Sequence, residues 1–187
     1  MQGLALEGGF ATPAVDAAHA FRVIMDTMAR PGTVKTIRGA QPPAPLSVAI
    51  GVCILTLCDH ETPVYLAKGY NAPSVKEWIA FHTGAPIVNA SDCLFAVGSW
   101  DSLLPLEQYS LGTTEYPDRS TTVIAELPRL DTNGATLSGP GIKATAALSI
   151  PHVAIFQNNH RHYPLGLDFI FSNGDRLAAL PRSTEIS

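Results

Sequence analysis

The sequence predicts an α/β fold in which a mixed β-sheet is covered by helices on both faces. Segments with helical periodicity alternate along the chain with short segments of high strand propensity, a pattern typical of a sheet packed between helices. A strong hairpin signal, Asn173-Gly174, joins the last two strand-like segments, so these two strands should be antiparallel and the sheet mixed.

The composition fits one domain that spans residues 1–187. Hydrophobic residues make up 46% of the chain and charged residues only 15%, so a substantial core can form. The fifteen prolines and fifteen glycines are dispersed, and no linker, repeat or low-complexity tract divides the chain. So small a charged fraction favours some apolar surface that is buried against a partner.

Charge and cysteine content argue against several classes of protein. The net charge of −4 disfavours a nucleic-acid binder, which normally presents a basic face. Three cysteines do not make a disulfide framework and no signal segment opens the chain, which favours a reduced, cytoplasmic setting. The longest apolar run, residues 46–58, is shorter than the roughly 20 residues that span a bilayer, so no membrane segment is expected.

The first helix is expected to begin near Pro13, which suits a first helical turn, and to end before Pro31-Gly32. A strand should follow at residues 33–37. Four apolar residues of the helix recur at spacings of three and four and are expected to form its core-facing side: Ala18, Phe21, Met25 and Met28.

A deeply buried helix is expected at residues 46–58, because this segment is apolar on nearly every side. A short strand should follow at 63–67. Ser74 and Glu77 have the spacing of a capping box, which predicts a helix that begins there and ends near Gly84.

The second half of the chain continues the alternation of helices and strands. A strand at 121–127 follows a polar loop, and a helix should begin at Ser149 or Pro151 and end by Asn159. The remaining expected elements are strands at 94–97, 167–172 and 176–180, a short helix at 103–109, and a strand that follows Asn133-Gly134.

Residues 137–142, Leu-Ser-Gly-Pro-Gly-Ile, form the most distinctive local sequence, and Lys143 follows them. Proline fixes one backbone angle, and glycine permits left-handed geometry or close approach of the backbone to another group. One interpretation is an anion-receiving loop with Ser138 and Lys143 at its margins; the alternative, favoured about two to one, is a tight turn after a buried strand. Neither a P-loop nor a dinucleotide-binding motif occurs.

Other chemically active residues lack a recognisable setting. His160-Arg161-His162 is interpreted as a polar loop, and no metal is expected. Ser138 lacks the Gly-x-Ser-x-Gly context of an activated nucleophile. No cofactor is expected, since none of the lysines has the setting of a Schiff-base residue for vitamin B6: Lys35, Lys68, Lys76 and Lys143.

Three arginines are notable for their positions. Arg22 lies on a mostly apolar helix, Arg30 precedes a Pro-Gly turn, and Arg182 follows a strand end. A guanidinium presents a planar fork that suits phosphate or carboxylate. For each arginine taken singly, an internal ion pair or a solvated side chain is the commoner role.

Eight motifs occur in order along the chain: Phe10-x-x-Pro13, Asp16-Ala17-x-His19-x-Phe21-Arg22, Met28-x-x-Pro31-Gly32, Leu55-x-Leu57-x-Asp59-x-x-Thr62-Pro63-Val64, Phe81-His82-Thr83, Leu137-Ser138-Gly139-Pro140-Gly141-Ile142, Pro164-Leu165-Gly166-Leu167-Asp168 and Leu180-Pro181-Arg182-Ser183-Thr184. Together they resemble the PhnH family, subunits of the bacterial carbon–phosphorus lyase system for phosphonates. The likeness runs from Phe10 to Thr184, with small departures at Pro140 and Tyr163.

The resemblance implies a homodimeric α/β protein similar to the large domain of vitamin B6-dependent transferases, without that cofactor. It also implies a cytoplasmic core complex with PhnG, PhnI and PhnJ. With the nucleotide-binding subunit PhnL, that system converts ATP and an alkylphosphonate into a ribose 1-phosphonate 5-triphosphate and displaces adenine. In the family, PhnI carries that chemistry.

The resemblance leaves two hypotheses open for the role of the chain. It is an obligatory assembly subunit with at most an accessory anion pocket, or it is itself a catalytic or substrate-binding subunit. An independent small-molecule enzyme is a weaker third hypothesis. The lack of a nucleophile or acid–base pair in a recognisable setting favours assembly.

The motifs also suggest where an anion would bind. Some of the residues in or beside them are expected to converge on a phosphate- or phosphonate-sized site, with glycine amides as close donors and arginine as a fork. The alternative is that each residue secures its own turn or strand end. The candidates are Arg22, His82, Ser138, Gly139, Gly141, Lys143 and Arg182.

Overall fold

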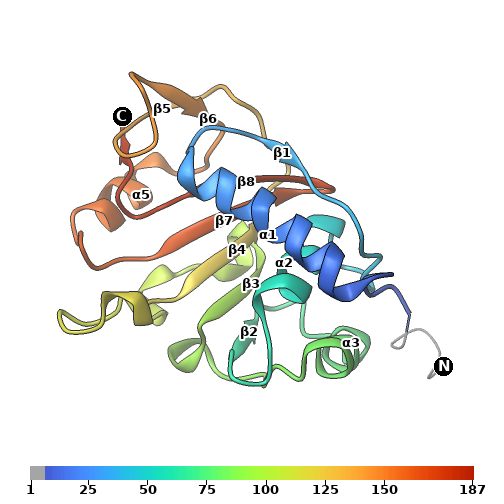
Figure 1. Cartoon of the computed structure of the whole chain (residues 1–187). Coiled ribbons are helices and arrows are strands. Elements are labelled where there is room, and N and C mark those ends of the chain that lie inside the picture. The colour runs from blue at the N-terminus through green and yellow to red at the C-terminus, as the bar shows by residue number, and fades with distance from the viewer. Residues whose placement is uncertain (1–6) are drawn as a thin grey trace.

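The computed structural model describes residues 7–187 and centres on a six-stranded sheet with the order β1-β8-β7-β4-β3-β2 (Figure 1). Four adjacent strands of this sheet are parallel to one another: β2 (Val64–Leu66), β3 (Phe95–Ser99), β4 (Thr122–Glu126) and β7 (Asp168–Asn173). β8 (Arg176–Leu180) pairs antiparallel with β7, and β1 (Lys35–Thr36) pairs antiparallel with β8. The prediction of a mixed sheet is confirmed, and the hairpin at residues 173–174 produces it.

Side chains of the central strands alternate between two hydrophobic cores, as the period of two in a strand requires. Val97, Ile124 and Ile170 belong to the first core, which is completed by α1 (Pro13–Ala29), α2 (Val48–Leu57) and α3 (Pro73–Thr83). Val123 and Phe169 belong to the second core, which takes in Trp100 of α4 (Trp100–Leu103) and Phe156 of α5 (Val153–His160). Helices therefore contribute to the packing on both faces of the sheet.

α2 is the buried helix that was expected at residues 46–58. Ser47 caps it, because its hydroxyl accepts a hydrogen bond from the amide of Ile50 at 3.3 Å. Residues 49–54 are all buried, which explains why the helix has no polar face. No helix within residues 7–187 is both long and apolar enough to cross a membrane.

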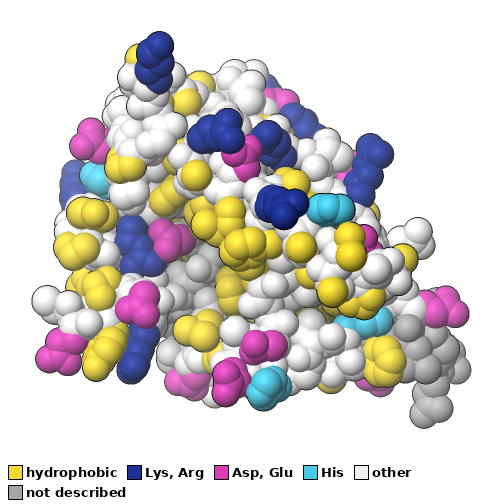
Figure 2. All heavy atoms as spheres, in the orientation of Figure 1, with side chains coloured by type: hydrophobic (Ala, Val, Ile, Leu, Met, Phe, Trp, Pro, Cys, Tyr) yellow, Lys and Arg dark blue, Asp and Glu magenta, His cyan; other side chains and the backbone are white. Residues whose placement is uncertain are grey.

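The core-facing side predicted for α1 is wrong except at Met28, which is partly buried against the first core. The structure buries Ala20, Ile24 and Thr27, whereas Phe21 is 47% exposed and Met25 46% exposed. The helix carries apolar residues on two sides, so its spacing pattern did not determine which side would pack against α2 and β8. The side left outside bears Val15, Phe21 and Met25, and we call it the α1 outer face. Figure 2 shows hydrophobic side chains gathered over this part of the molecule.

Two local predictions of helix structure are also corrected. α3 begins at Pro73 with Ala72 as its N-cap, and no side chain caps it, so the expected capping box does not form. Its end at Gly84, in the left-handed conformation, is as predicted. The helix expected at 103–109 is interrupted: α4 ends at Leu103, and a 3₁₀ turn, η3 (Leu106–Gln108), follows Pro105, because proline cannot continue the hydrogen-bond ladder of a helix.

A second sheet of three strands was not predicted. Its order is β6-β5-β9, with β5 (Ala135–Ser138) between β6 (Ala146–Leu148) and β9 (Glu185–Ile186), all antiparallel. Figure 1 shows β5 and β6 apart from the main sheet, at the end of the molecule opposite α3. β5 is the strand expected before the Gly-Pro-Gly loop, whereas β6 and β9 are too short to give a pattern. Two further 3₁₀ turns are η2 (Ala90–Asp92) and η4 (Pro117–Arg119).

Candidate functional site

The Gly-Pro-Gly loop packs against the end of α1. Gly139 and Gly141 have φ angles of 121° and 80°, and the loop closes with a hydrogen bond from the amide of Ile142 to the carbonyl of Gly139 at 3.1 Å. A Cβ atom at Gly141 would lie 1.9 Å from the carbonyl oxygen of Ala29. Glycine is therefore required here for close approach to a helix end. The C-terminal carbonyls of a helix are electronegative, which is unfavourable for an anion beside Gly141.

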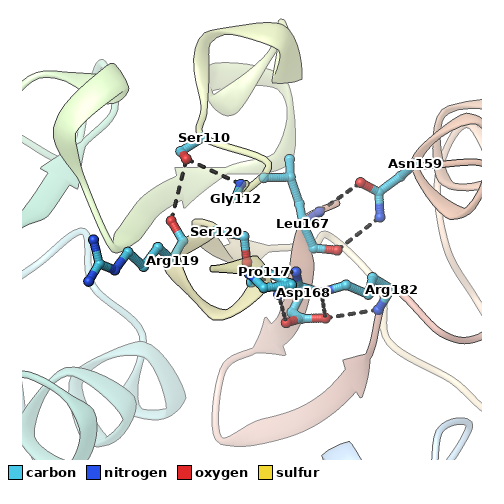
Figure 3. Close-up of polar contacts among 9 residues, drawn as sticks. All are labelled: Ser110, Gly112, Pro117, Arg119, Ser120, Asn159, Leu167, Asp168 and Arg182. Carbon is cyan, nitrogen blue, oxygen red and sulfur yellow. Dashed lines mark hydrogen bonds and ion pairs between the residues drawn. The ribbon is translucent and has the colours of Figure 1, made fainter. Parts of the chain in front are cut away.

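The guanidinium of Arg182 makes four contacts within the chain, which occupy most of its five N–H groups (Figure 3). Its Nη2 lies 2.5 Å from Oδ2 of Asp168, and its Nε donates to Oδ1 of the same carboxylate at 3.1 Å. Nη1 donates to the carbonyl of Pro117 at 2.8 Å, and Nη2 also donates to the hydroxyl of Ser120. Through these contacts Arg182 connects the loop before β4 to the start of β7. Only 13% of its side chain is exposed. These contacts leave it little capacity to bind a ligand.

Hydrogen bonds around this ion pair fix the neighbouring segments as well. Asn159 of α5 forms two bonds with the backbone of Leu167, accepting its amide at 2.8 Å and donating to its carbonyl at 2.9 Å (Figure 3). A ring nitrogen of His160 lies 2.9 Å from the carbonyl of Arg182. Hydrogen bonds thus connect the ion pair and the end of α5 at the amino ends of β4 and β7.

The structure brings some of the other predicted site residues together and separates the rest. Ser138 donates to Oε2 of Glu185 at 3.5 Å, beside Gly139. Arg22 and Lys143 are exposed and make no hydrogen bond or ion pair within residues 7–187. His82 lies on α3, where its ring nitrogen is 3.4 Å from the carbonyl of Glu7 and its ring packs on Trp78. Anion binding by this set stays a prediction, and the surroundings of its members weigh against a single site.

A cavity of about 330 Å³ does adjoin the Gly-Pro-Gly loop. The last turns of α1 form one wall through Met25 and Met28, and Pro140 and Asp168 form others. This cavity is continuous with the α1 outer face through Met25, which lines both. Its walls are mainly apolar, so they favour an apolar contact rather than a polar ligand.

A second cavity was missed by the sequence analysis. It has a volume of about 450 Å³ and lies at the carboxyl ends of β3 and β4, and we call it the carboxyl-edge cavity. Three stretches of the chain line it: 99–101, 126–134 in part, and 149–152. Ligands of open α/β sheets bind characteristically outside the carboxyl ends of the strands. Polar residues at the end of predicted strands were the available signal, as in Ser99 and Glu126.

His152 is the most unusual residue of the carboxyl-edge cavity. It has φ of 50° and ψ of 56°, and within residues 7–187 it is the one non-glycine residue with a positive φ. Its Nδ1 accepts a hydrogen bond from Nε1 of Trp100 at 2.9 Å, and the two rings are stacked. A left-handed residue of this kind costs on the order of 1 kcal/mol, so the surrounding structure must hold it. The hydrogen bond from Trp100 holds the His152 ring in one orientation and contributes to this support.

Charged groups of both signs face this cavity. The carboxylate of Glu126 accepts hydrogen bonds from the hydroxyl of Ser172 at 2.5 Å and the amide of Gly174 at 3.0 Å. Arg129 forms an ion pair with Asp131, and its hydrogen bond lowers the pKa of that carboxyl group below its usual value. No group of three His, Cys, Asp or Glu side chains within residues 7–187 is placed to hold a metal ion, and the absence of a bound metal stays a prediction.

Comparison with known proteins identifies the family. Residues 8–187 match the family described as "Bacterial phosphonate metabolism protein (PhnH)". The chain belongs to the PhnH family. The resemblance carried by the eight motifs is thereby confirmed over nearly the whole sequence.

Two curated relatives extend this comparison. "Alpha-D-ribose 1-methylphosphonate 5-triphosphate synthase subunit PhnH" of Rhizobium meliloti (strain 1021) is 39% identical over 96% of this chain and 94% of its own length. "Putative C-P lyase subunit protein HtxG" of Stutzerimonas stutzeri is 29% identical over 90% of this chain and 84% of its own length. Homologues in the PhnH family are thus subunits of the synthase or lyase complex.

Proposed function

We propose that this chain is a subunit of a carbon–phosphorus lyase complex and is needed for making ribose 1-methylphosphonate 5-triphosphate from ATP and an alkylphosphonate. The observation that carries the proposal is the near full-length match to the PhnH subunit of that synthase from Rhizobium meliloti. The expected partners are PhnG, PhnI and PhnJ, in the cytoplasm. We also propose that the chain resembles the large domain of the vitamin B6-dependent transferases and that it binds no vitamin B6 group.

An assembly role is favoured over catalysis by what the polar residues do. Arg182, the best placed of the predicted anion ligands, is held by four hydrogen bonds or ion-pair contacts to Asp168, Pro117 and Ser120. The three cysteines are buried, and burial raises the pKa of the Cys93 thiol, so it is a poor nucleophile. Lys35 is paired with Asp26 at 2.9 Å rather than placed in a cavity.

The α1 outer face supports a further part of the proposal, namely that the isolated chain is a homodimer. Val15, Phe21 and Met25 leave about half of their surface exposed along one helix, and Figure 2 shows a hydrophobic area there. Complete burial of a fully exposed side chain of this kind contributes about 1.5–3 kcal/mol, so burying the exposed half of each would contribute roughly half as much. A second copy of this chain is the occupant that we propose for this face.

The second candidate function, substrate binding by this subunit, is favoured by the carboxyl-edge cavity. Its place at the strand ends and its charged side chains are those of a ligand site. Under this alternative the chain would present a small molecule to the complex. The two functions are compatible, because the cavity and the α1 outer face share no residue.

Co-purification tests the subunit proposal. Affinity-tagged PhnI is co-expressed with PhnG, PhnJ and this chain, and the stoichiometry of the eluted complex is measured by native mass spectrometry. We expect this chain to elute with the other three subunits in a fixed ratio. Elution of PhnG, PhnI and PhnJ alone, with this chain folded and in excess, would contradict the proposal.

A further inference from the structure

The carboxyl-edge cavity is lined by hydrogen-bonding groups that the subunit role does not explain. The loops at 129–133 and 149–152 contribute side chains whose acceptor atoms are already used within the chain. The segments that follow β3 and β4 contribute carboxylates. Groups that suit an anion and groups that suit a cation therefore line one cavity.

The first pair of donors comes from the loop after β4. Nε of Arg129 is paired with Asp131, and Nη2 donates to Oδ1 of Asn133 at 3.0 Å. Nη1 of Arg129 makes no hydrogen bond to any residue in the described range, 7–187. Because the amide oxygen of Asn133 accepts from Arg129, its amide nitrogen remains as a donor. This loop thus offers free donors and the guanidinium of Arg129, whose charge is shared with the carboxylate of Asp131.

The second pair of donors comes from the segment before α5. The oxygen of Ser149 accepts the amide of Asp131 at 2.7 Å, so its hydroxyl proton is left to donate. Nδ1 of His152 accepts the indole N–H of Trp100, which places the proton of the neutral ring on Nε2. His152 holds a left-handed backbone conformation in this arrangement. Both side chains therefore add donors to the lining of the cavity.

Two carboxylates also line the cavity. Glu126, at the end of β4, has one internal partner on each oxygen, which orients the group and leaves further lone pairs. Asp101, in α4, is exposed and has no hydrogen bond or ion pair within the described part of the chain. A carboxylate accepts strongly from an ammonium group, so these two residues suit an amine.

We propose that the carboxyl-edge cavity binds a small zwitterion, a molecule with an oxyanion at one end and an amine at the other. Arg129, Asn133, Ser149 and His152 donate to the oxyanion, and Glu126 and Asp101 accept from the amine. A simple anion would meet two carboxylates, and a simple cation would meet Arg129. The volume of about 450 Å³ lies in the range of small-molecule sites. The proposal does not rest on membership of the lyase complex.

The two tryptophans supply a test with an internal control. Trp100 lies beneath His152, whereas Trp78 is fully buried in the other core and donates to the carbonyl of Glu7. Their indole N–H signals are followed by NMR while the intact protein is titrated with β-alanine and with phosphoethanolamine. We expect saturable shifts of the Trp100 signal and none of the Trp78 signal. The two zwitterions distinguish a carboxylate oxyanion from a phosphate oxyanion.

Compounds of single charge and matched variants complete the test. Propionate, ethylamine and inorganic phosphate should bind at least about tenfold more weakly than the better zwitterion, because each lacks one charge-assisted interaction. Arg129→Gln should weaken zwitterion binding by about tenfold or more, while Arg38→Gln, another exposed and ion-paired arginine, should not change it. The proposal is overturned if neither zwitterion shifts Trp100 at about 10 mM. It is equally overturned if a singly charged compound binds as well, or if the two arginine variants behave alike.

Discussion

Arg182 and Asp168 form a two-pronged ion pair in which Nη2 lies 2.5 Å from Oδ2 and Nε lies 3.1 Å from Oδ1. The pair is largely buried, with 13% of the arginine and 22% of the aspartate side chain exposed. Its two residues belong to two of the family motifs, and Arg182 was a predicted ligand of the anion site. The geometry assigns Arg182 a structural partner instead.

Replacing Arg182 should therefore lower stability. Arg182→Ala removes the ion pair and leaves Asp168 with only the backbone amide of residue 182 as a donor, so the free energy of unfolding should fall by about 2–4 kcal/mol. Urea denaturation followed by circular dichroism measures this change. Arg38→Ala, which breaks a pair whose arginine is 79% exposed, is the control and should change stability by less than about 1 kcal/mol. Unchanged stability of Arg182→Ala together with lost phosphate binding would instead support the anion-site prediction.

Gly141 should tolerate no side chain. Its φ is 80°, and a Cβ atom would lie 1.9 Å from the carbonyl oxygen of Ala29, so Gly141→Ala must displace the loop or the end of α1. We expect a loss of about 3 kcal/mol or more in the free energy of unfolding. Gly174→Ala is the matched control, since its φ is 65° and no atom lies within 4 Å of the added Cβ.

The Gly174→Ala variant should cost only about 1 kcal/mol, the penalty for left-handed backbone without a clash. Chemical denaturation of both variants in parallel separates the clash from the conformational cost. Equal losses for the two variants would show that close approach to Ala29 does not matter.

Acid should weaken the α1 end through Asp26. Hydrogen bonding to Lys35, with the charges of Arg30 and Lys35, lowers the pKa of Asp26 in the folded protein. Because the pKa of Asp26 is lower in the folded than in the unfolded chain, its ionised carboxylate stabilises the folded protein. This contribution to the free energy of unfolding is fully present above the unfolded-state pKa of about 3.9 and is lost as pH falls through the folded-state pKa. Lys35→Gln should raise the pKa of Asp26 toward its ordinary value, which NMR titration of the carboxyl carbon measures. An unshifted titration curve would rule out Lys35 as the main cause.

The α1 outer face should control self-association. Light scattering of the isolated chain should give about twice its mass of 19.8 kDa, because Phe21 and Met25 would be buried between two copies. The double variant Phe21→Ser/Met25→Ser should be folded and monomeric. Ala20 and Ile24, the buried side of the same helix, are unchanged in it. A wild-type chain that stays monomeric at high concentration, or a variant that stays dimeric, would contradict the assignment.

Local sequence patterns predicted the central elements of the fold correctly, because the pattern of each central element was consistent with only one type of secondary structure. β4 has high strand propensity, β7 and β8 flank a strong turn, α2 is apolar on nearly every side, and the structure has all four where they were predicted. α1 has apolar residues on two sides, so its orientation depended on what α2 offered. β6 and β9 have three and two residues and become strands only because β5 lies between them.

The carboxyl-edge cavity could not be predicted as a unit from the sequence. Trp100 lies at the start of α4, Arg129 in the loop after β4, and His152 between β6 and α5. The parallel pairing of β3 with β4 brings the first two segments together, and the position of His152 beside Trp100 depends on tertiary packing. The seven candidate residues of the anion site were chosen because they lie in or beside the family motifs. A motif indicates family membership, but it does not show whether a side chain contacts a ligand or other residues of the chain. Arg182 and Gly141 show how an internal contact can account for a distinctive motif.

The claim that this chain is a required subunit is tested most directly by reconstitution. PhnG, PhnI, PhnJ and PhnL are assembled with and without this chain, and formation of ribose 1-methylphosphonate 5-triphosphate from ATP and methylphosphonate is followed by phosphorus NMR. The account predicts product only when this chain is present, with folded Arg182→Lys protein restoring activity in proportion to its amount in the complex. Full activity of the complex assembled without this chain would contradict it.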